Sequence, residues 1–270
     1  MSQPPRTENE RLGAATASAG LFDRIVCGID ETTESLEAVR QASKLCFPEG
    51  KVALVAADEL WSDAAGLRAV DEREIERALE AVLSRAAELA PDAERRLVNG
   101  PAVTALVDAA EEATLVVLGT HGTSRAVAVA IGSVGYRVLH DAPCSVLVAR
   151  PSLFPDAFPA SIAVGVDGST ASLAAVEEAQ KLAERFGAEI RFIAAHDDKA
   201  DLGRAREAVP DLVHDDRDAV DALVAAGGDA DMVVVGSRGL HGLRSLGSVS
   251  ERVAHKAPSS VLVVRRPEPA

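Results

Sequence analysis

Two segments of this 270-residue chain combine closely spaced glycines with a Gly-Ser pair, a pattern suited to holding phosphate. In the first segment, Gly119-x2-Gly122 is followed after nine residues by Gly132-Ser133. Glycine lets backbone N–H groups approach an anion because it has no Cβ. A Gly-Ser pair that opens a helix adds free N–H donors, a hydroxyl and the positive end of the helix dipole. The second segment has a seven-residue spacer in the same pattern: Gly236, Gly239, Gly247 and Ser248.

A carboxylate ends an apolar run in each half of the chain, Asp30 in IVCGID and Asp167 in IAVGVD. Such a side chain could accept a hydrogen bond from a ribose hydroxyl or bind the water shell of a cation. It could also merely cap the helix that follows, just as a single glycine is more often a turn residue than a ligand contact. The ligand-binding interpretation is favoured by the whole set, because it occurs twice in the same order.

Neighbouring residues bear on the size and charge of such a site. Ala57 and Ala195 are small enough to leave room for an adenine ring. Glu31 stands where the second half has Gly168-Ser169, and this extra carboxylate would oppose phosphate unless it points away or helps to hold Mg²⁺. The nine-residue spacer contains one cation, Arg125, so backbone donors would have to hold most of a phosphate's charge.

These residues belong to an internal repeat, which indicates a duplication because its segments keep their order. The offset between matching segments falls from 137 to 117 and then to 115 residues, so the second copy lacks 20 residues in its middle and 2 in the glycine segment. The matching pairs are Ile25–Asp30 with Ile162–Asp167, Leu115–Gly119 with Met232–Gly236, and Ala142–Arg150 with Ala257–Arg265.

Apolar runs typical of buried strands alternate with segments of helical periodicity, which implies βαβ units with right-handed crossovers. We therefore predict two tandem α/β domains, each an open five-stranded parallel sheet of Rossmann-like form with helices on both faces. Ligands of such sheets bind beyond the carboxyl ends of the strands, where the glycines and aspartates above fall. In the first copy the predicted strands are Arg24–Ile29, Val52–Ala57, Arg95–Val98, Leu115–Leu118 and Ser145–Ala149, and the predicted helices contain Leu36–Leu45, Leu67–Leu89, Val103–Ala110 and Val134–His140.

The second copy is predicted to be shorter, with a weak signal for its third strand near Leu212–His214. We expect a disordered tail over residues 1–20, domains over 21–150 and 160–266, and a proline-rich linker over 151–159. The other predicted strands of this copy are Ile162–Val166, Glu189–Ala194, Met232–Gly236 and Val261–Val264, and the predicted helices are Leu173–Phe186 and Leu202–Val209.

Composition excludes several classes of function. A net charge of −14 makes a nucleic-acid groove improbable. The chain shows neither a membrane-length apolar run nor a signal peptide, so we expect a cytoplasmic protein. The cysteines Cys27, Cys46 and Cys144 suit neither a disulfide framework nor a metal site.

Several known signatures are missing from the sequence. There is no P-loop, no Gly-x-Gly-x-x-Gly after the first strand and no nucleophile with a base at motif spacing, so we expect no catalytic residues. The histidines lack metal-binding spacing, although His121 and His241 fall in the glycine segments and could touch a ligand.

The spacing Gly119-x2-Gly122-x9-Gly132-Ser133 resembles the ATP-binding motif of the universal stress protein family. The VGVDGS-type opening and the APCSVLV ending resemble that family too, and both halves of the chain take part. The resemblance implies a tandem universal stress protein with five-stranded parallel sheets, dimerisation and, in one branch of the family, ATP binding. It also implies that Val146–Ala149 and Val261–Val264 pair within one chain as an internal pseudo-dimer, which would protect two apolar edge strands. A homodimer of whole chains and protein partners stay open.

On this basis we expect ATP, with Mg²⁺ held through the nucleotide near Asp30, to bind mainly to the first copy. The shorter spacer predicts that the second copy binds weakly, differently or not at all, because each residue spans at most about 3.5 Å. The expected nucleotide site is Ile29, Asp30, Ala57, Leu118, Gly119, Gly122, Gly132, Ser133 and Val134. The equivalent second-copy residues are Asp167, Ser169, Ala195, Gly236, Gly239, Gly247 and Ser248.

Three functions compete at this point. The first is a stress-response module that binds ATP without fast turnover. The second is a dimerisation or interaction scaffold that binds no nucleotide, which the extra carboxylate Glu31 and the shortened second copy favour. The third is a slow ATP hydrolase with a metal at Asp30, which lacks an evident general base.

Overall fold

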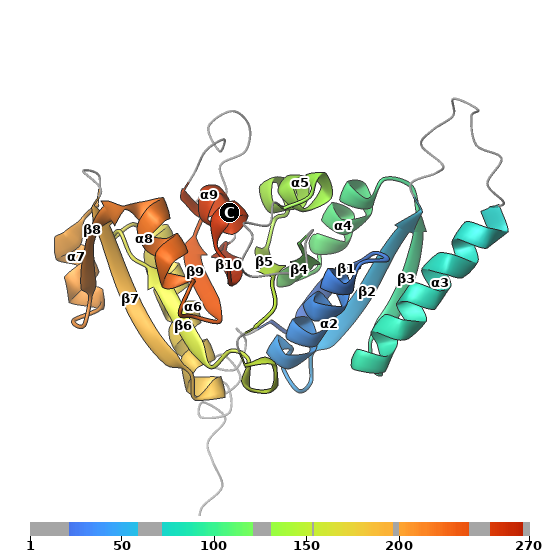
Figure 1. The fold of residues 1–270 in the computed structure, drawn as a ribbon, viewed down its shortest axis with the longest axis horizontal. Helices are drawn as coiled ribbons and strands as arrows, with labels where there is room; N and C mark the ends of the chain where they lie inside the picture. The colour runs from blue at the N-terminus through green and yellow to red at the C-terminus, as the bar shows by residue number, and fades with distance from the viewer. Residues whose placement is uncertain are drawn as a thin grey trace, which may run out of the picture.

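Ten strands form one continuous sheet in the computed structural model, which describes residues 22–58, 72–120, 131–152, 154–196, 200–237 and 249–266. The strand order is β3-β2-β1-β4-β5-β10-β9-β6-β7-β8 (Figure 1). Every neighbouring pair is parallel except the central pair, β5 with β10. The α/β fold with a mostly parallel sheet is therefore as predicted. The predicted tail over 1–20 lies outside the described residues.

The described part of the first half contains five parallel strands and four helices, close to their predicted limits. The apolar run of β1 is buried from its second residue onward, as expected for a strand covered on both faces. Helix α3 begins at Glu72, so the first residues of the predicted helix lie outside the described part of the chain. The elements are β1 (Arg24–Ile29), α2 (Thr33–Leu45), β2 (Lys51–Asp58), α3 (Glu72–Leu89), β3 (Glu94–Asn99), α4 (Ala102–Ala110), β4 (Leu115–Gly119), α5 (Ser133–Asp141) and β5 (Ser145–Ala149).

The second half repeats this order in shorter form. Its α7 has 7 residues where α3 has 18, which is where the missing residues were predicted. The elements are β6 (Ser161–Gly165), α6 (Thr170–Phe186), β7 (Glu189–His196), α7 (Leu202–Ala208), β8 (Val213–Asp218), α8 (Ala219–Ala226), β9 (Met232–Gly236), α9 (Val249–Lys256) and β10 (Ser260–Val264).

Three details of this half differ from the prediction. β8 runs on to Asp218, through a polar stretch that gave no strand signal, and β6 ends one residue before Val166. Helix α8 was not predicted, because its Ala-rich run is short and directly follows a strand. Between the two halves, the linker contains a 3₁₀ turn at residues Pro155–Ala157. Lys44 of α2 donates to the carbonyl oxygens of Pro155 and Asp156 in this turn (2.7 Å to Asp156).

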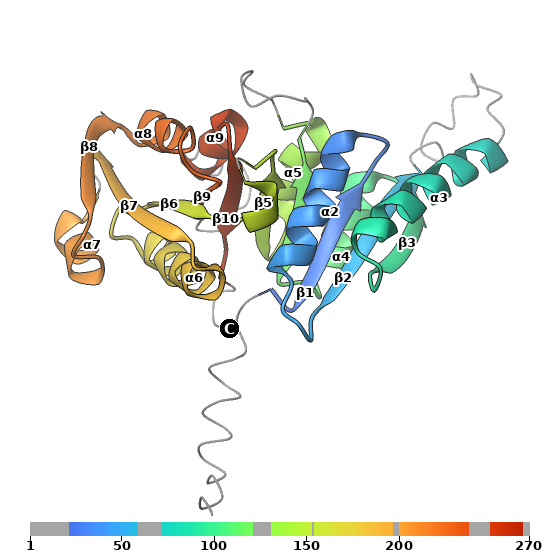
Figure 2. The same ribbon diagram turned by 60° about the horizontal axis from the view of Figure 1, so that its bottom comes forward.

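The two halves join edge to edge through their last strands. Val261, Leu262 and Val263 of β10 pair antiparallel with Val148, Leu147 and Val146 of β5. The predicted pairing within one chain is confirmed, and Figure 2 shows these strands side by side at the centre of the sheet. Neither strand is left as an exposed apolar edge.

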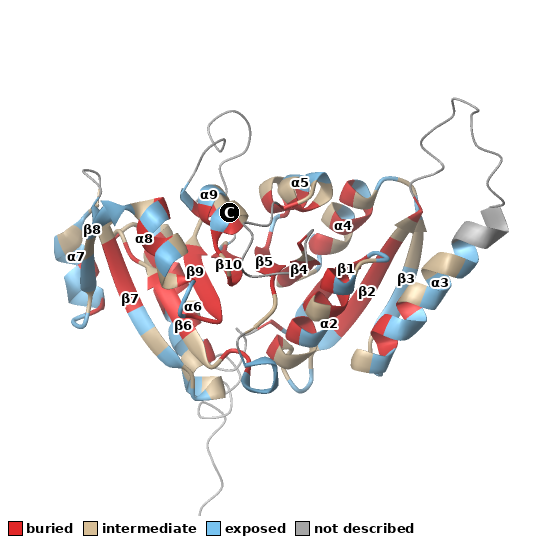
Figure 3. Cartoon of the chain, in the orientation of Figure 1, coloured by how far each residue is buried: buried red, intermediate tan, exposed pale blue. Residues whose placement is uncertain are grey.

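Helices cover both faces of the sheet and enclose two apolar cores. One core lies under α2, α3, α6 and α7, and the other under α4, α5, α8 and α9. Each core runs through both halves of the chain, and the strands between them are largely buried (Figure 3). The thiols of Cys27 and Cys144 are buried in these layers. Among the described helices, none is long and apolar enough to cross a membrane.

Candidate functional site

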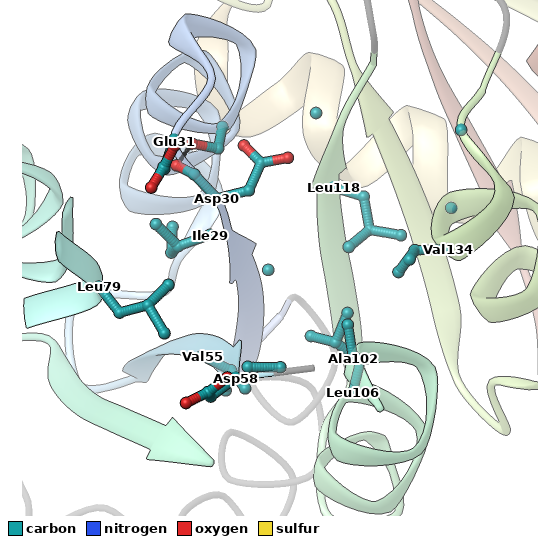
Figure 4. A pocket seen from close by; sticks show the side chains of 16 residues that line it. Ile29, Asp30, Glu31, Val55, Asp58, Leu79, Ala102, Leu106, Leu118 and Val134 are labelled. Atoms are coloured by element: carbon teal, nitrogen blue, oxygen red, sulfur yellow. Dashed lines mark hydrogen bonds between the residues drawn. The ribbon is translucent and has the colours of Figure 1, made fainter. Parts of the chain in front are cut away.

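A pocket of about 360 Å³ opens at the carboxyl ends of β1, β2 and β4 (Figure 4). This is the edge of a parallel α/β sheet where ligands usually bind. Its lining residues come from these strands, from helices α2 to α5 and from the residues beside them: Gly28, Ile29, Asp30, Glu31, Ser35, Val55, Ala57, Asp58, Leu79, Ala102, Leu106, Leu118, Gly119, Gly132, Val134 and Gly135.

Most of the expected first-copy residues meet in this pocket, although they come from four separate segments. Ser133 is the exception, because it occupies the exposed first position of α5 and is not part of the lining. Gly122 lies outside the described residues. The predicted residues that line the pocket are Ile29, Asp30, Ala57, Leu118, Gly119, Gly132 and Val134.

Asp30 is held by the turn between β1 and α2. Its Oδ1 accepts hydrogen bonds from the backbone N–H of Thr32 (3.0 Å) and from the Thr32 hydroxyl. The cap of α2 is Thr32, whose side chain accepts from the N–H of Ser35, so the alternative that Asp30 merely caps this helix is wrong. Because both bonds engage Oδ1, the other carboxylate oxygen stays available to a ribose hydroxyl or to water bound to a cation.

The start of α5 supplies backbone donors to the pocket. Gly132 is the N-cap residue, with φ −62° and ψ 168°, and it has no side chain to accept from the first-turn N–H groups. The following Val134 and Gly135 line the pocket with Gly132. Uncapped N–H groups at the positive end of a helix attract an anion such as phosphate.

The middle of the pocket is apolar. Figure 4 shows Ile29 and Leu79 on one side and Leu118, Val134 and Leu106 on the other. A ring of purine size could be enclosed between these two apolar sides. Gly28 helps to keep this space open, because a Cβ there would lie 2.7 Å from Cδ2 of Leu118.

The charged groups of the lining are all acidic among the described residues. Asp30 and Glu31 are exposed and lie together at one end of the pocket, and Asp58 is buried at another (Figure 4). No lysine, arginine or histidine is among the described lining residues. A polyphosphate bound here would therefore depend on the amides of α5 and on a divalent cation that offsets the carboxylates.

The thiol nearest the pocket is unsuited to nucleophilic chemistry. Cys27 precedes Gly28 in β1 and is fully buried. Burial raises the pKa of this thiol far above its usual value, and the neighbouring Asp30 carboxylate raises it further. At neutral pH Cys27 is protonated, so it acts as a small core residue.

The glycine that ends β4 is needed for packing, in addition to any contact with phosphate. A Cβ on Gly119 would lie 2.6 Å from the backbone carbonyl carbon and oxygen of Glu34, at the start of α2. In the second half, a Cβ on Gly236 would lie 2.1 Å from the carbonyl oxygen of Ala171. Both glycines are thus required where a strand end meets a helix backbone. From the sequence we considered these glycines as anion contacts or as turn residues, and neither interpretation included this packing against a helix.

The equivalent strand end of the second half is built differently. Asp167 accepts from the N–H of Ser169 (2.9 Å), and Ser169 caps α6. Gly168 has φ +77°, and a Cβ there would lie 2.3 Å from the carbonyl oxygen of Asp201. The N–H of Asp201 also donates to the carbonyl of Asp167 (2.8 Å), so the start of α7 is fastened directly onto this strand end.

The remaining second-copy residues are only partly described. Ala195 is half-buried beside a register shift in the pairing of β7 with β8. Gly236 ends β9, as noted above. The candidates Gly239, Gly247 and Ser248 lie outside the described residues, as do His121, Arg125 and His241.

About half of the residues that line the pocket were not predicted from the sequence. Gly28, Val55 and Asp58 stand within two residues of predicted strand ends, so a wider search around those ends would have found them. Leu79 and Leu106 lie on helices and carry only the general signal of an apolar helix face. Their role as pocket walls depends on how α3 and α4 pack against the sheet.

Comparison with known proteins identifies relatives along the whole repeat. The universal stress protein family matches residues 21–150, 160–211 and 202–265. A universal stress protein of Mycobacterium tuberculosis strain H37Rv is 33% identical over 201 residues, which covers 63% of this chain and 68% of the relative. A second universal stress protein of that strain is 31% identical over 206 residues, covering 65% and 69%.

Solved structures also resemble the fold. The crystal structure of a universal stress protein from Archaeoglobus fulgidus matches with a TM-score of 0.69 and 20% identity, and covers 91% of this chain and 97% of that protein. At this identity the match concerns the fold alone, and it extends over both halves of the sheet.

Proposed function

The chain belongs to the universal stress protein family, and on that premise we propose that its first half binds ATP with Mg²⁺ and does not turn it over rapidly. The second half would serve chiefly as the partner that completes the sheet. The observation that carries the proposal is the pocket at the ends of β1, β2 and β4, in which an apolar slot, a carboxylate and an uncapped helix start occur together.

Each part of the pocket suits one part of the nucleotide. The apolar side chains Ile29, Leu106 and Leu118 would enclose the adenine ring, with Ala57 leaving room at the end of β2. Asp30 would accept from a ribose hydroxyl. The amides at the start of α5 would hold the phosphates, whose negative charge the helix dipole favours.

The acidic lining fits a divalent cation between the protein and the phosphates. Oxygen ligands such as the Asp30 and Glu31 carboxylates are those that Mg²⁺ prefers, and Mg²⁺ usually keeps several of its waters. Bound Mg²⁺ would supply positive charge that offsets the repulsion between these carboxylates and the triphosphate. We therefore expect ATP binding to depend on Mg²⁺ more steeply than it would in a pocket with basic side chains.

Slow turnover is expected because the described lining offers little for hydrolysis. Its ionisable side chains are the three carboxylates, and a water attacking the γ-phosphate would need a positioned base and cations on the developing charge. The proposal is thus of a binding module whose nucleotide stays largely intact. Phosphate release that survives repeated purification and disappears in Asp30→Ala would overturn this part.

Isothermal titration of ATP onto the purified chain, with and without Mg²⁺, tests the proposal. We expect saturable heat with Mg²⁺ present, together with a rise in Tm, because a ligand that binds only the folded state stabilises it. Absence of both heat and thermal shift at millimolar ATP would refute nucleotide binding.

A scaffold that binds no nucleotide is the second candidate, and the three lining carboxylates favour it. The two functions differ in what the protein carries through purification. Mass spectrometry of protein denatured directly after purification should release an adenine nucleotide if the pocket binds one tightly. Complete absence of nucleotide, combined with a flat titration, would favour the scaffold.

A further inference from the structure

A residue of the second half forms hydrogen bonds to a helix of the first half across the β5–β10 pairing, which we call the seam. Arg265, just after β10, donates from its guanidinium to the carbonyl oxygens of Leu139 and Ala142. These carbonyls lie at the C-terminal end of α5, where a helix leaves acceptors unsatisfied. The Ser145 hydroxyl fixes the arginine in turn, since it accepts from the N–H of Arg265 (3.1 Å).

The opposite end of the same helix forms part of the pocket. Gly132, Val134 and Gly135 line it, whereas Leu139 and Ala142 receive the arginine. Helix α5 has 9 residues, or about 13 Å at 1.5 Å per residue. Such a short helix moves as a rigid rod, so a shift at one end displaces the amides at the other.

The first half has an arginine at the equivalent position, and its guanidinium bonds to a different helix. Arg150, just after β5, donates to the carbonyl oxygens of Ala254 (2.6 Å) and Ser259 (3.3 Å), and its N–H donates to the Ser260 hydroxyl (3.0 Å). Ala254 belongs to α9, which contributes no residue to the described pocket. The two arginines therefore make similar bonds across one seam, but only the guanidinium of Arg265 holds a helix of the pocket, because Arg150 meets the pocket helix α2 through its backbone carbonyl, which a side-chain substitution leaves in place.

We propose that Arg265 is a positioning residue for the first-half nucleotide site, which makes that site dependent on the second half of the chain. The proposal rests on the function proposed above. The planar guanidinium fixes two carbonyls in one geometry, and its positive charge at the negative end of α5 favours the helix. The rings of Tyr136 in α5 and His255 in α9, with centroids 5.7 Å apart, form a second contact between α5 and the second half of the chain.

The test compares Arg265→Lys with Arg150→Lys in the full-length chain. Lysine keeps the charge but cannot reproduce the two-pronged contact. With wild-type protein as reference, ATP with Mg²⁺ is titrated at a temperature well below the Tm of all three proteins. We expect Arg265→Lys to raise the Kd about fivefold and Arg150→Lys to change it less than about twofold, while both lower the Tm. A merely structural role would not separate the two variants in Kd.

Ser145→Ala and Ser260→Ala form a milder pair, in which each variant removes the hydroxyl that receives the N–H of one arginine. Ser260→Ala also removes the bond that its hydroxyl donates to Oε1 of Gln41 (2.9 Å), which lies in α2 beyond the pocket residue Ser35. If a lysine variant fails to fold, this pair tests the role of Arg265 in its place. We expect a raised Kd for Ser145→Ala alone. Folded variants of both pairs that bind ATP as the wild type does, or that weaken it equally, would overturn the role of Arg265. Absence of binding by the wild type would instead refute the proposed function.

Discussion

The two halves share their strands and their packing glycines but differ in what covers the end of the first strand. In the first half, β1 ends at a pocket bounded by α3 and α5. In the second half, the equivalent strand end carries Asp201 of the α7 start, which is bonded to Asp167 and packed against Gly168. The shorter second copy brings α7 down onto the strand. The difference teaches that a duplicated sheet can keep its core while one short connection decides whether a binding site remains.

The largest expected effect concerns the start of α5. Gly132→Asp places a carboxylate where phosphate would bind, and should weaken ATP binding at least about 100-fold, or about 2.7 kcal/mol. Stability should stay the same or rise slightly, because φ is −62° and Asp is a good N-cap residue. Titration and thermal unfolding measure the two properties separately. Gly247→Asp, the equivalent change in the second half, should leave ATP binding almost unchanged, and equal losses would mean that the halves are ranked wrongly.

The packing glycines should behave alike in both halves. Gly119→Ala and Gly236→Ala each force a Cβ against a helix backbone, at 2.6 Å and 2.1 Å, and should each cost about 1–3 kcal/mol of stability. Urea unfolding gives both values. Tolerance of alanine at Gly236 but not at Gly119 would contradict a shared structural role and return Gly119 to ligand binding.

The strand-end aspartates should differ between the halves. Asp30→Ala removes the oxygen offered to ribose and Mg²⁺ and should weaken ATP binding about tenfold, or about 1.4 kcal/mol. Asp167→Ala should leave the Kd unchanged, since the start of α7 is bonded to Asp167 and packs against this strand end. Titrations with and without Mg²⁺ are needed, because the loss at Asp30 should shrink when Mg²⁺ is absent. An equal loss in both variants would show two working sites.

The smallest expected effect is a pH dependence of the chain's stability, which arises from a glutamate near the seam. Gln41 of α2 donates to the carbonyl of Arg150 (2.7 Å), and Glu178 occupies the equivalent position of α6. Burial raises the pKa of Glu178, against the opposing effect of Lys181 at 3.7 Å. A carboxyl whose pKa is raised by folding favours the protonated native state, so its contribution to stability is present below the unfolded pKa and is lost as pH rises through the folded pKa.

Glu178→Gln copies the first half and should therefore stabilise the chain at pH 7 by up to about 1 kcal/mol. The gain should shrink as pH falls toward the unfolded pKa, and most of it should be lost near pH 4. Urea unfolding at the two pH values provides the comparison. A wild type that is more stable than the variant at pH 7 would show that the Lys181 ion pair outweighs burial.

Much of the fold could be predicted from the sequence because its signals are local or repeated. The buried strands of an α/β sheet are apolar runs, and the duplication marked their order twice. The pairing of β5 with β10 was predicted from the resemblance to the family, and it covers the apolar strand that ends each copy. The polar strand β8, with exposed residues from Val213 to Asp218, lacks such a signal and was only partly predicted.

The site was predicted where it depends on strand ends and was missed where it depends on packing. Asp30, Ala57 and Gly132 follow from chain position, whereas Leu79 enters the pocket only through the placement of α3. The fastening of Asp201 onto Asp167 likewise depends on a tertiary contact that no local pattern encodes. The roles of these residues toward ATP remain predictions.

The central claim is one nucleotide site per chain, in the first half. The stoichiometry of a tight-binding titration of ATP with Mg²⁺, measured on wild-type protein stripped of bound nucleotide, tests it most directly. We expect about one ATP per chain in the wild type, and none in Gly132→Asp. About two per chain in the wild type, or one remaining in Gly132→Asp, would contradict it.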